Sequence, residues 1–461
     1  MPRPGLRLRT ALLTPPLSLL LAAPQAAAAP ATAASSGHPR AATDLPYDVR
    51  DYDVDIAYTP ESETLSGRTT LTATAGPELH SIELALRLTA TSVTVDGAPV
   101  ESFRQTDDTL RVDLPGPLPD GHRFTAEITY EGVPGESPAW VPTTDGGSVT
   151  VTGASVGTWF PAHDTTRDQA LLRVRATVPS DWVAVSNGTA TPPEARGDTA
   201  VFGWSTSHAL SPESAVLGMG PWETERSRLS DGTPVTNVYG AGQKERMKPL
   251  ADQAPRMVDF LAGAYGPYPF DTFGGIYVEA LSEETPFYAP QGRVVFPAPD
   301  WADESVLVHE LAHQWFGVSV GGDGSASACL GECFATYAEW MWAADQSGVD
   351  LDDRYRDGIR EHQDDEAWWS GTIESGAATY TKSPFMMHAL LHYVGEDAFR
   401  RLLTRWPTEN AHGVRTWHEF EVMAGEEAGR DMTGFFDAWI RGRSEPPSSY
   451  LWPGTLTPRS R

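Results

Sequence analysis

The chain has 461 residues, long enough for two or three domains that each bury a core. Its formal net charge of −28 opposes binding to nucleic acid or to an anionic membrane surface, because both carry dense negative charge. Its two cysteines are too few for a disulfide framework, which excludes the small disulfide-stapled classes of protein.

The N-terminal residues have the features of a targeting signal. Three arginines precede an apolar run at residues 11–23 and an alanine-rich stretch at residues 26–29. This pattern predicts a signal peptide over residues 1–29, too short for a membrane span, and a disordered linker over residues 30–44. We therefore expect a secreted protein without a membrane span in the mature chain. The alternative is a segment retained as an N-terminal anchor.

Residues 45–240 contain short runs in which apolar and polar residues alternate, as in half-buried strands. Examples are Tyr52–Tyr58, Leu71–Ala73, Ile82–Leu86, Val93–Val95, Leu171–Val178 and Val183–Ser186. Glycine and proline separate these runs, with turns expected at Asp96-Gly97 and Asn187-Gly188. The pattern predicts one large all-β domain over residues 45–240.

Residues 241–445 have the apolar period of amphipathic helices instead. The expected helices cover Met257–Tyr265, a segment that starts at Ser383-Pro384 with Ser383 as its cap, Glu396–Trp406, and Met432–Arg441. We predict a mainly helical second domain over residues 241–445 and an extended tail over residues 446–461.

The strongest functional signal lies in this helical part. His309 and His313 are four residues apart, so on a helix capped by Asp303 and running to Phe316 they share one face and can hold one ion. Glu310 lies between them and is free to act as a base. Eighteen residues separate His313 from Glu332, which leaves room for a second helix that returns a carboxylate as the third ligand.

Two imidazoles and one carboxylate leave the fourth position of a zinc ion open for water, as in catalytic zinc sites. The less favoured interpretation is that these side chains are solvated residues on amphipathic helices. Cys329 and Cys333 flank the third ligand and are either bonded, if Cys329 precedes the helix, or two small buried residues.

Nearly the whole mature chain resembles the zinc aminopeptidase family that includes membrane alanyl aminopeptidase, bacterial aminopeptidase N and leukotriene hydrolase. The residues that carry the resemblance are Tyr47-Asp48-Val49, Trp159–Asp164, Val178-Pro179, Ser186-Asn187-Gly188, Tyr268-Pro269-Phe270 and the extended zinc motif. The resemblance implies an N-terminal β-sandwich or saddle domain followed by a thermolysin-like α+β catalytic domain. It also implies a short bacterial form without the helical-repeat domain that many members add.

The resemblance further implies roles for residues beyond the metal motif. The family's catalytic tyrosine corresponds to Tyr380 in Tyr380-Thr381-Lys382-Ser383, where serine replaces the usual glycine, and its hydroxyl would stabilise the oxyanion. Glu339, two helical turns beyond Glu332, is either a partner for a zinc histidine or a surface carboxylate.

One family signature is missing. The Gly-x-Met-Glu-Asn segment, whose glutamate holds the substrate's amino group, is replaced by the sequence at residues 274–286. Glu283 or Glu284 could take that role, or both could belong to a solvated acidic turn.

These observations predict a secreted zinc aminopeptidase with one zinc ion per chain and a peptide substrate. Glu310 would be the general base, and Tyr380 would stabilise the developing charge. The alternatives are an endopeptidase, an epoxide or ester hydrolase on the same zinc site, or a catalytically silent binding module.

Overall fold

The structure is a computed structural model. It describes residues 45–135, 139–151, 156–282, 285–297, 300, 302–324, 326–374 and 376–458. The predicted signal peptide and linker lie outside these residues. Among the described residues, none of the helices combines the length and the apolar character needed to cross a bilayer.

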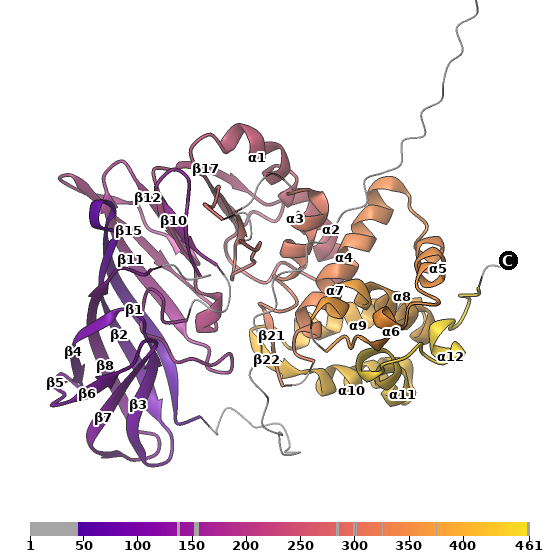
Figure 1. Ribbon diagram of the computed structural model, residues 1–461, viewed down its shortest axis with the longest axis horizontal. Helices are drawn as coiled ribbons and strands as arrows, with labels where there is room; N and C mark the ends of the chain where they lie inside the picture. The colour runs from indigo at the N-terminus through magenta and orange to yellow at the C-terminus, as the bar shows by residue number, and fades with distance from the viewer. Residues whose placement is uncertain are drawn as a thin grey trace, which may run out of the picture. The chain divides into compact units, whose positions relative to one another are not determined.

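The N-terminal part is built from three sheets (Figure 1). The largest runs β13 (Thr189–Ala190), β15 (Thr199–Ser205), β11 (Leu171–Pro179), β1 (Tyr47–Thr59), β2 (Thr64–Ala75), β8 (Arg123–Gly132), β4 (Thr89–Val95) and β5 (Ala98–Pro99), with β14 (Glu194–Arg196) against β15. The second runs β12 (Val183–Ser186), β16 (Leu217–Gly220), β10 (Ser148–Thr150) and β9 (Trp140–Pro142), and the third runs β3 (Leu79–Ala85), β7 (Thr109–Leu118) and β6 (Phe103–Gln105).

The alternating sequence pattern determines which face of each strand is buried. Val54 and Ile56 on β1 are buried, whereas Asp55 between them faces outward and pairs with Arg175 on the parallel neighbour β11. The expected turn after β4 is present, and both Asp96 and Gly97 have positive φ, as a two-residue hairpin turn of this kind requires.

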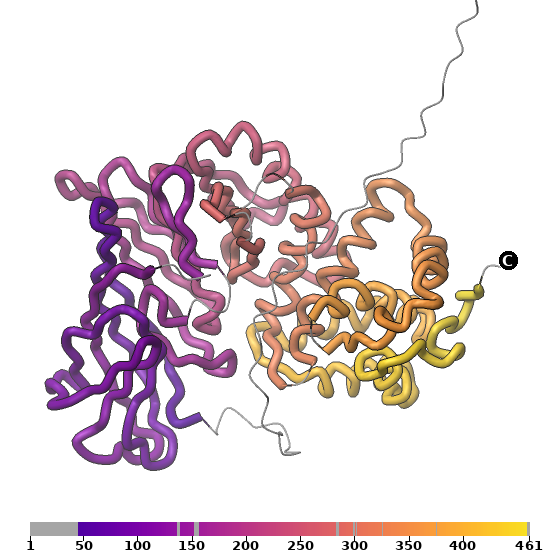
Figure 2. Tube along the Cα trace, in the orientation of Figure 1, coloured from indigo at the N-terminus to yellow at the C-terminus, as the bar shows by residue number. Residues whose placement is uncertain are grey.

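The C-terminal part is mainly helical, so the predicted fold class is confirmed. Its helices are α1 (Lys244–Ala251), α2 (Ala254–Tyr265), α3 (Glu304–Ala312), α4 (Cys329–Ser347), α5 (Leu351–Glu361), α6 (Glu366–Ser370), α7 (Ala377–Thr381), α8 (Ser383–Val394), α9 (Glu396–Glu409), α10 (Trp417–Ala428), α11 (Thr433–Phe436) and α12 (Ser448–Leu451). A π-helical turn, Asp437–Arg441, follows α11, and β21 (Val320–Asp323) pairs with β22 (Gly413–Thr416). Helices α3 and α4 lie side by side (Figures 1 and 2).

Three details differ from the sequence-based expectations. Ser383 does not cap α8: it is the first helical residue, is fully buried, and makes no capping hydrogen bond. Helix α3 ends at Ala312 and not at Phe316, because the following amides bond three residues back: Gln314 donates to the Leu311 carbonyl and Trp315 to the Ala312 carbonyl, both at 3.1 Å. The C-terminal tail is not wholly extended, since α12 forms within it.

A further sheet joins the two parts. It runs β17 (Glu223–Arg228), β18 (Pro234–Tyr239), β19 (Gly275–Tyr277) and β20 (Val294–Phe296). Ile276 and Val295 face the apolar core of the β-rich part, whereas Tyr277 and Phe296 face the core of the helical part. The predicted boundary at residue 240 therefore falls directly after β18, inside a continuous sheet.

Buried side-chain amides reinforce this junction. The side-chain Nδ2 of Asn187 donates to the carbonyls of Ser214 (3.0 Å) and Gln291 (2.9 Å), and its Oδ1 accepts from the Val216 amide (2.8 Å). Asn187 therefore links the β-rich part to the loop that precedes β20.

Replacing Asn187 should destabilise the protein. Asn187→Ala would leave three buried backbone groups without partners, so we expect the free energy of unfolding to fall by roughly 2–4 kcal/mol. Asn187→Asp keeps the acceptor for the Val216 amide but loses both donated bonds. Its free energy of unfolding should therefore also be lower than that of the unaltered protein. Denaturant unfolding curves measure both, and a loss below about 0.5 kcal/mol in the alanine variant would contradict this account.

Candidate active site

Three side chains from α3 and α4 converge on one point. His309 lies in the last turn of α3, His313 is its C-terminal cap, and Glu332 lies in the first turn of α4. The two Nε2 atoms are 3.2 Å apart, and the Glu332 Oε2 lies 3.2 Å from His309 Nε2 and 3.5 Å from His313 Nε2. The structure thus brings together the three residues that the sequence motif singled out, and the group could hold a metal ion.

The donor set fits zinc. Zinc bonds of about 2.0–2.1 Å in a tetrahedron separate neighbouring ligand atoms by roughly 3.3 Å, close to the spacing observed here. Borderline-soft imidazole nitrogens together with one carboxylate oxygen are ligands that zinc prefers. Three protein ligands leave one tetrahedral position for water or substrate.

Helix α3 begins as expected, because the Asp303 side chain accepts a hydrogen bond from the Val306 amide (3.0 Å).

Both imidazoles are held through their Nδ1 atoms, which leaves each Nε2 free for the metal. His309 Nδ1 lies 2.8 Å from Glu339 Oε1, and His313 Nδ1 lies 3.1 Å from the Phe316 carbonyl oxygen. Glu339 is therefore a partner of a zinc histidine and not a free surface carboxylate.

Sequence reasoning missed the side chain that orients Glu339. Ser305, one turn before His309 on α3, donates to the second Glu339 oxygen (2.9 Å). It also missed Gln314, which is fully buried and holds the loop before β20 through Gly292, Pro290 and Arg293. The available signal for Gln314 was an amide-bearing residue within an apolar run.

Glu310 is buried beside the three ligands. Burial is the main reason that its pKa is raised, and the nearby carboxylates raise it further while the two histidines oppose the rise. The pKa of Glu332 moves the other way: burial would raise it, but the charge of His313 and hydrogen bonds from both histidines lower it. The site therefore contains one carboxylate suited to bind a cation and one suited to exchange a proton.

Tyr380, on α7, comes to the same site from a different helix. Its ring stacks with the His309 ring at a centroid distance of 6.3 Å, and its side chain is 45% exposed. Partial burial and the nearby charge of Glu332 raise the pKa of Tyr380. The phenol therefore stays protonated at neutral pH and can donate a hydrogen bond.

Cys329 and Cys333 form a disulfide, with their Cα atoms 4.7 Å apart. Cys329 is the first residue of α4, so the bond closes the first turn of the helix around Glu332. The bond is therefore present, but the expected condition was wrong, because Cys329 does not precede the helix.

Glu283 and Glu284, the residues expected near the substrate amine, lie outside the described residues. The segment that leads to them runs along the β-rich part, where the Leu281 amide donates to the Pro142 carbonyl (3.0 Å).

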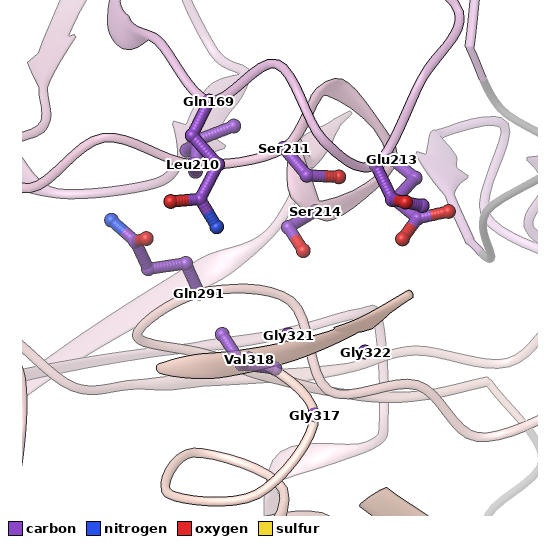
Figure 3. Close-up of a pocket in the computed structure, with 11 residues that line it drawn as sticks. Gln169, Leu210, Ser211, Glu213, Ser214, Gln291, Gly317, Val318, Gly321 and Gly322 are labelled. Carbon is purple, nitrogen blue, oxygen red and sulfur yellow. The ribbon is translucent and has the colours of Figure 1, made fainter. Parts of the chain in front are cut away.

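The structure also has a small polar cavity (Figure 3). Its lining includes Gln169, Glu213, Gln291, Gly317 and Val318. His309, Glu310, His313, Glu332 and Tyr380 do not line it. We therefore do not assign this cavity to the substrate.

Comparisons with known proteins agree with this site. Residues 300–439 match the model described as "Peptidase family M1 domain". Aminopeptidase N of Streptomyces lividans is 23% identical over 445 residues, covering 87% of this chain and 50% of that protein. Aminopeptidase N of Lactococcus lactis subsp. lactis is 23% identical over 295 residues, covering 54% of this chain and 33% of that protein.

Solved structures show the same similarity over both parts of the chain. The M1 zinc metallopeptidase of Deinococcus radiodurans has a TM-score of 0.78 and 26% identity, covering 90% of this chain and 97% of that structure. By contrast, the chain spans between a third and a half of the length of the two aminopeptidases N.

Fold and site together resemble those of the two-domain zinc metallopeptidases. Residues 300–439 match the Peptidase family M1 domain, and the expected resemblance of the chain to the zinc aminopeptidases is confirmed. Zinc is the cofactor that this family and the His309–His313–Glu332 group imply.

Glu339 should strengthen zinc binding through His309. Glu339→Ala removes the carboxylate that fixes the imidazole, so we expect zinc affinity to fall about 10–100-fold. Competition with a chelator of known affinity measures the change. Asp345→Ala, which removes an exposed carboxylate from the same helix, is the control and should bind zinc as tightly as the unaltered chain. Equal affinity in both variants would contradict the role of Glu339.

Proposed function

We propose that the protein is a secreted zinc aminopeptidase that removes N-terminal residues from peptides. The observation that carries the proposal is the position of Glu310, buried beside three convergent metal ligands, with the Tyr380 ring stacked against one of them, His309.

His309, His313 and Glu332 would hold the zinc ion. When bound, zinc supplies Lewis acidity, which lowers the pKa of a water ligand and polarises a carbonyl group. Glu310 accepts a proton from the attacking water and then delivers it to the leaving amine nitrogen as the peptide bond breaks. Its buried position and raised pKa suit the first half of that transfer, because a more basic carboxylate accepts the proton more readily.

Tyr380 would act on the carbonyl oxygen of the scissile peptide bond. The scissile carbonyl oxygen gains negative charge when water attacks, and a protonated phenol can donate a hydrogen bond to it. Tyr380 is 45% exposed, which leaves room for its hydroxyl to reach that oxygen when substrate enters.

Known relatives support a peptide substrate with a free amino group. Relatives in Lactococcus, Arabidopsis and Streptomyces are named aminopeptidases. A variant of the Deinococcus enzyme has been solved with the peptide substrate Tyr-Ser-Ala. We propose Glu283 or Glu284 as the anchor for the substrate's ammonium group, which would place the first peptide bond at the metal.

The proposal of secretion rests on the N-terminal sequence, with its arginines, short apolar run and alanine-rich stretch. The disulfide at the start of α4 is compatible with an oxidising compartment.

Glu310→Gln should retain zinc and lose turnover. The amide has nearly the same shape but cannot accept the proton, so we expect kcat to fall by at least about 10²-fold while the zinc content is unchanged. Glu304→Gln, which alters an exposed glutamate on the same helix, is the control and should keep its activity. Steady-state kinetics and elemental analysis measure both properties. If Glu310→Gln turned over normally, Glu310 would not be the base.

A matched panel of peptides tests exopeptidase specificity. We expect free-amine peptides to lose their first residue and N-acetylated copies of the same peptides to remain intact, because acetylation removes the charge that a glutamate would bind. Mass spectrometry of the products identifies the cleaved bond. Internal cleavage of the acetylated peptides would show an endopeptidase, and hydrolysis of esters or epoxides alone would show a different hydrolase.

A further inference from the structure

A second cluster of two histidines and one carboxylate lies between α5 and α8, and none of its members belongs to the candidate active site. His388 and His392 are four residues apart on α8, and Asp352 is on α5. The Asp352 Oδ1 lies 3.1 Å from His388 Nε2 and 2.8 Å from His392 Nε2. All three potential ligand atoms lie within 4.8 Å of one another.

This cluster repeats the construction of the candidate zinc centre. In both places one helix supplies two histidines with a spacing of four, and a neighbouring helix supplies the carboxylate. In both places the Nε2 atoms face inward and the Nδ1 atoms have other partners. His388 Nδ1 lies 3.1 Å from the Tyr337 hydroxyl, and His392 Nδ1 lies 3.0 Å from the Thr455 hydroxyl. Such outer partners orient metal-binding imidazoles.

The carboxylate is also oriented for a ligand role. The Asp352 Oδ2 is 3.1 Å from an Arg356 guanidinium nitrogen, which leaves Oδ1 for the histidines. His388 is almost fully buried, whereas the side chains of Asp352 and His392 are 30% and 15% exposed. A cation could therefore enter from the solvent side of Asp352.

The proton positions separate two states of this cluster. When each Nδ1 donates to its hydroxyl partner, three lone-pair-bearing atoms face one another, and a cation between them removes the repulsion. When each Nε2 carries the proton instead, both histidines donate to Asp352 and no cation is needed. Metal titration distinguishes the two states directly.

We propose that Asp352, His388 and His392 form a second cation site, separate from the catalytic one, for a divalent transition metal such as zinc. Two of its three donors are imidazole nitrogens, which select zinc and its neighbours over calcium and magnesium, since the latter prefer oxygen ligands.

The site would be structural. Its members hold the C-terminal segment: His392 contacts Thr455, and Arg356, the partner of Asp352, donates to the Thr457 carbonyl (3.1 Å). A cation that fixes Asp352 and His392 would fasten this segment to α5 and α8. It would stabilise the folded chain, because the unfolded chain does not present the three ligands together.

The test is the zinc content of the full chain after dialysis against zinc and removal of the excess, measured by elemental analysis. We expect two zinc ions per chain in the unaltered protein. Each of the variants Asp352→Asn and His392→Gln should retain only one. Asp353→Asn is the matched control, because Asp353 is next in sequence and also pairs with Arg356 but lies outside the cluster, and it should retain two. Circular dichroism shows whether each variant is folded. If His392→Gln does not fold, the near-isosteric Asp352→Asn still tests the proposal.

His313→Ala isolates the second site from the first. It should retain one zinc ion, and adding zinc should raise its thermal midpoint by several degrees, whereas His313→Ala combined with Asp352→Asn should show no shift. Two results would overturn the proposal. In the first, the unaltered chain holds one zinc ion and His313→Ala holds none. In the second, the unaltered chain and Asp352→Asn both hold two. Calcium giving the same thermal shift as zinc would overturn the assigned class of metal.

Discussion

The packing of α3 against α4 is the constraint on which the rest of the site depends. Two imidazole nitrogens and a carboxylate oxygen must stand close to 3.3 Å apart to share one zinc ion, and unrestrained side chains would not hold that spacing. Helix α3 fixes the histidines through its own four-residue spacing, and α4 contributes both the third ligand, Glu332, and the carboxylate that orients His309. Glu332 and Glu339 are seven residues apart on α4, so this one helix places both a metal ligand and the residue that orients another ligand. The disulfide at the start of α4 adds a covalent restraint on the turn that contains Glu332.

The sheet formed by β17 to β20 contributes residues to the apolar cores of both parts of the chain. One face of the sheet completes the apolar core of the β-rich part, and the other completes the helical core, so neither core is closed without it. Gln314, next to the ligand His313, holds the loop that leads into β20. The metal ligands are thus connected through a few buried bonds to the sheet that both cores share. This arrangement suits a catalytic site whose substrate must be positioned to a fraction of an ångström.

The sequence predicted those features that depend on residues close together in the chain. His309, His313 and the Asp303 cap depend on the geometry of one helix, and the alternating strands depend on which face is buried, so both could be expected from the sequence. Features that depend on the packing of distant segments could not. Serine is a residue type common at caps, but Lys382 already has helical backbone angles, so Ser383 lies inside α8 and is buried. Asp352 lies 36 residues from His388, so only the packing of α5 on α8 reveals that they meet.

The measurement that tests the central claim most directly is anomalous diffraction at the zinc absorption edge from crystals of the zinc-loaded protein. The account predicts a zinc peak bonded to the Nε2 atoms of His309 and His313 and to the Glu332 carboxylate, with Glu310 beside it and unbound. Zinc-replete crystals in which no peak lies within bonding distance of these two histidines would contradict it, and so would a peak that Glu310 ligates in place of Glu332.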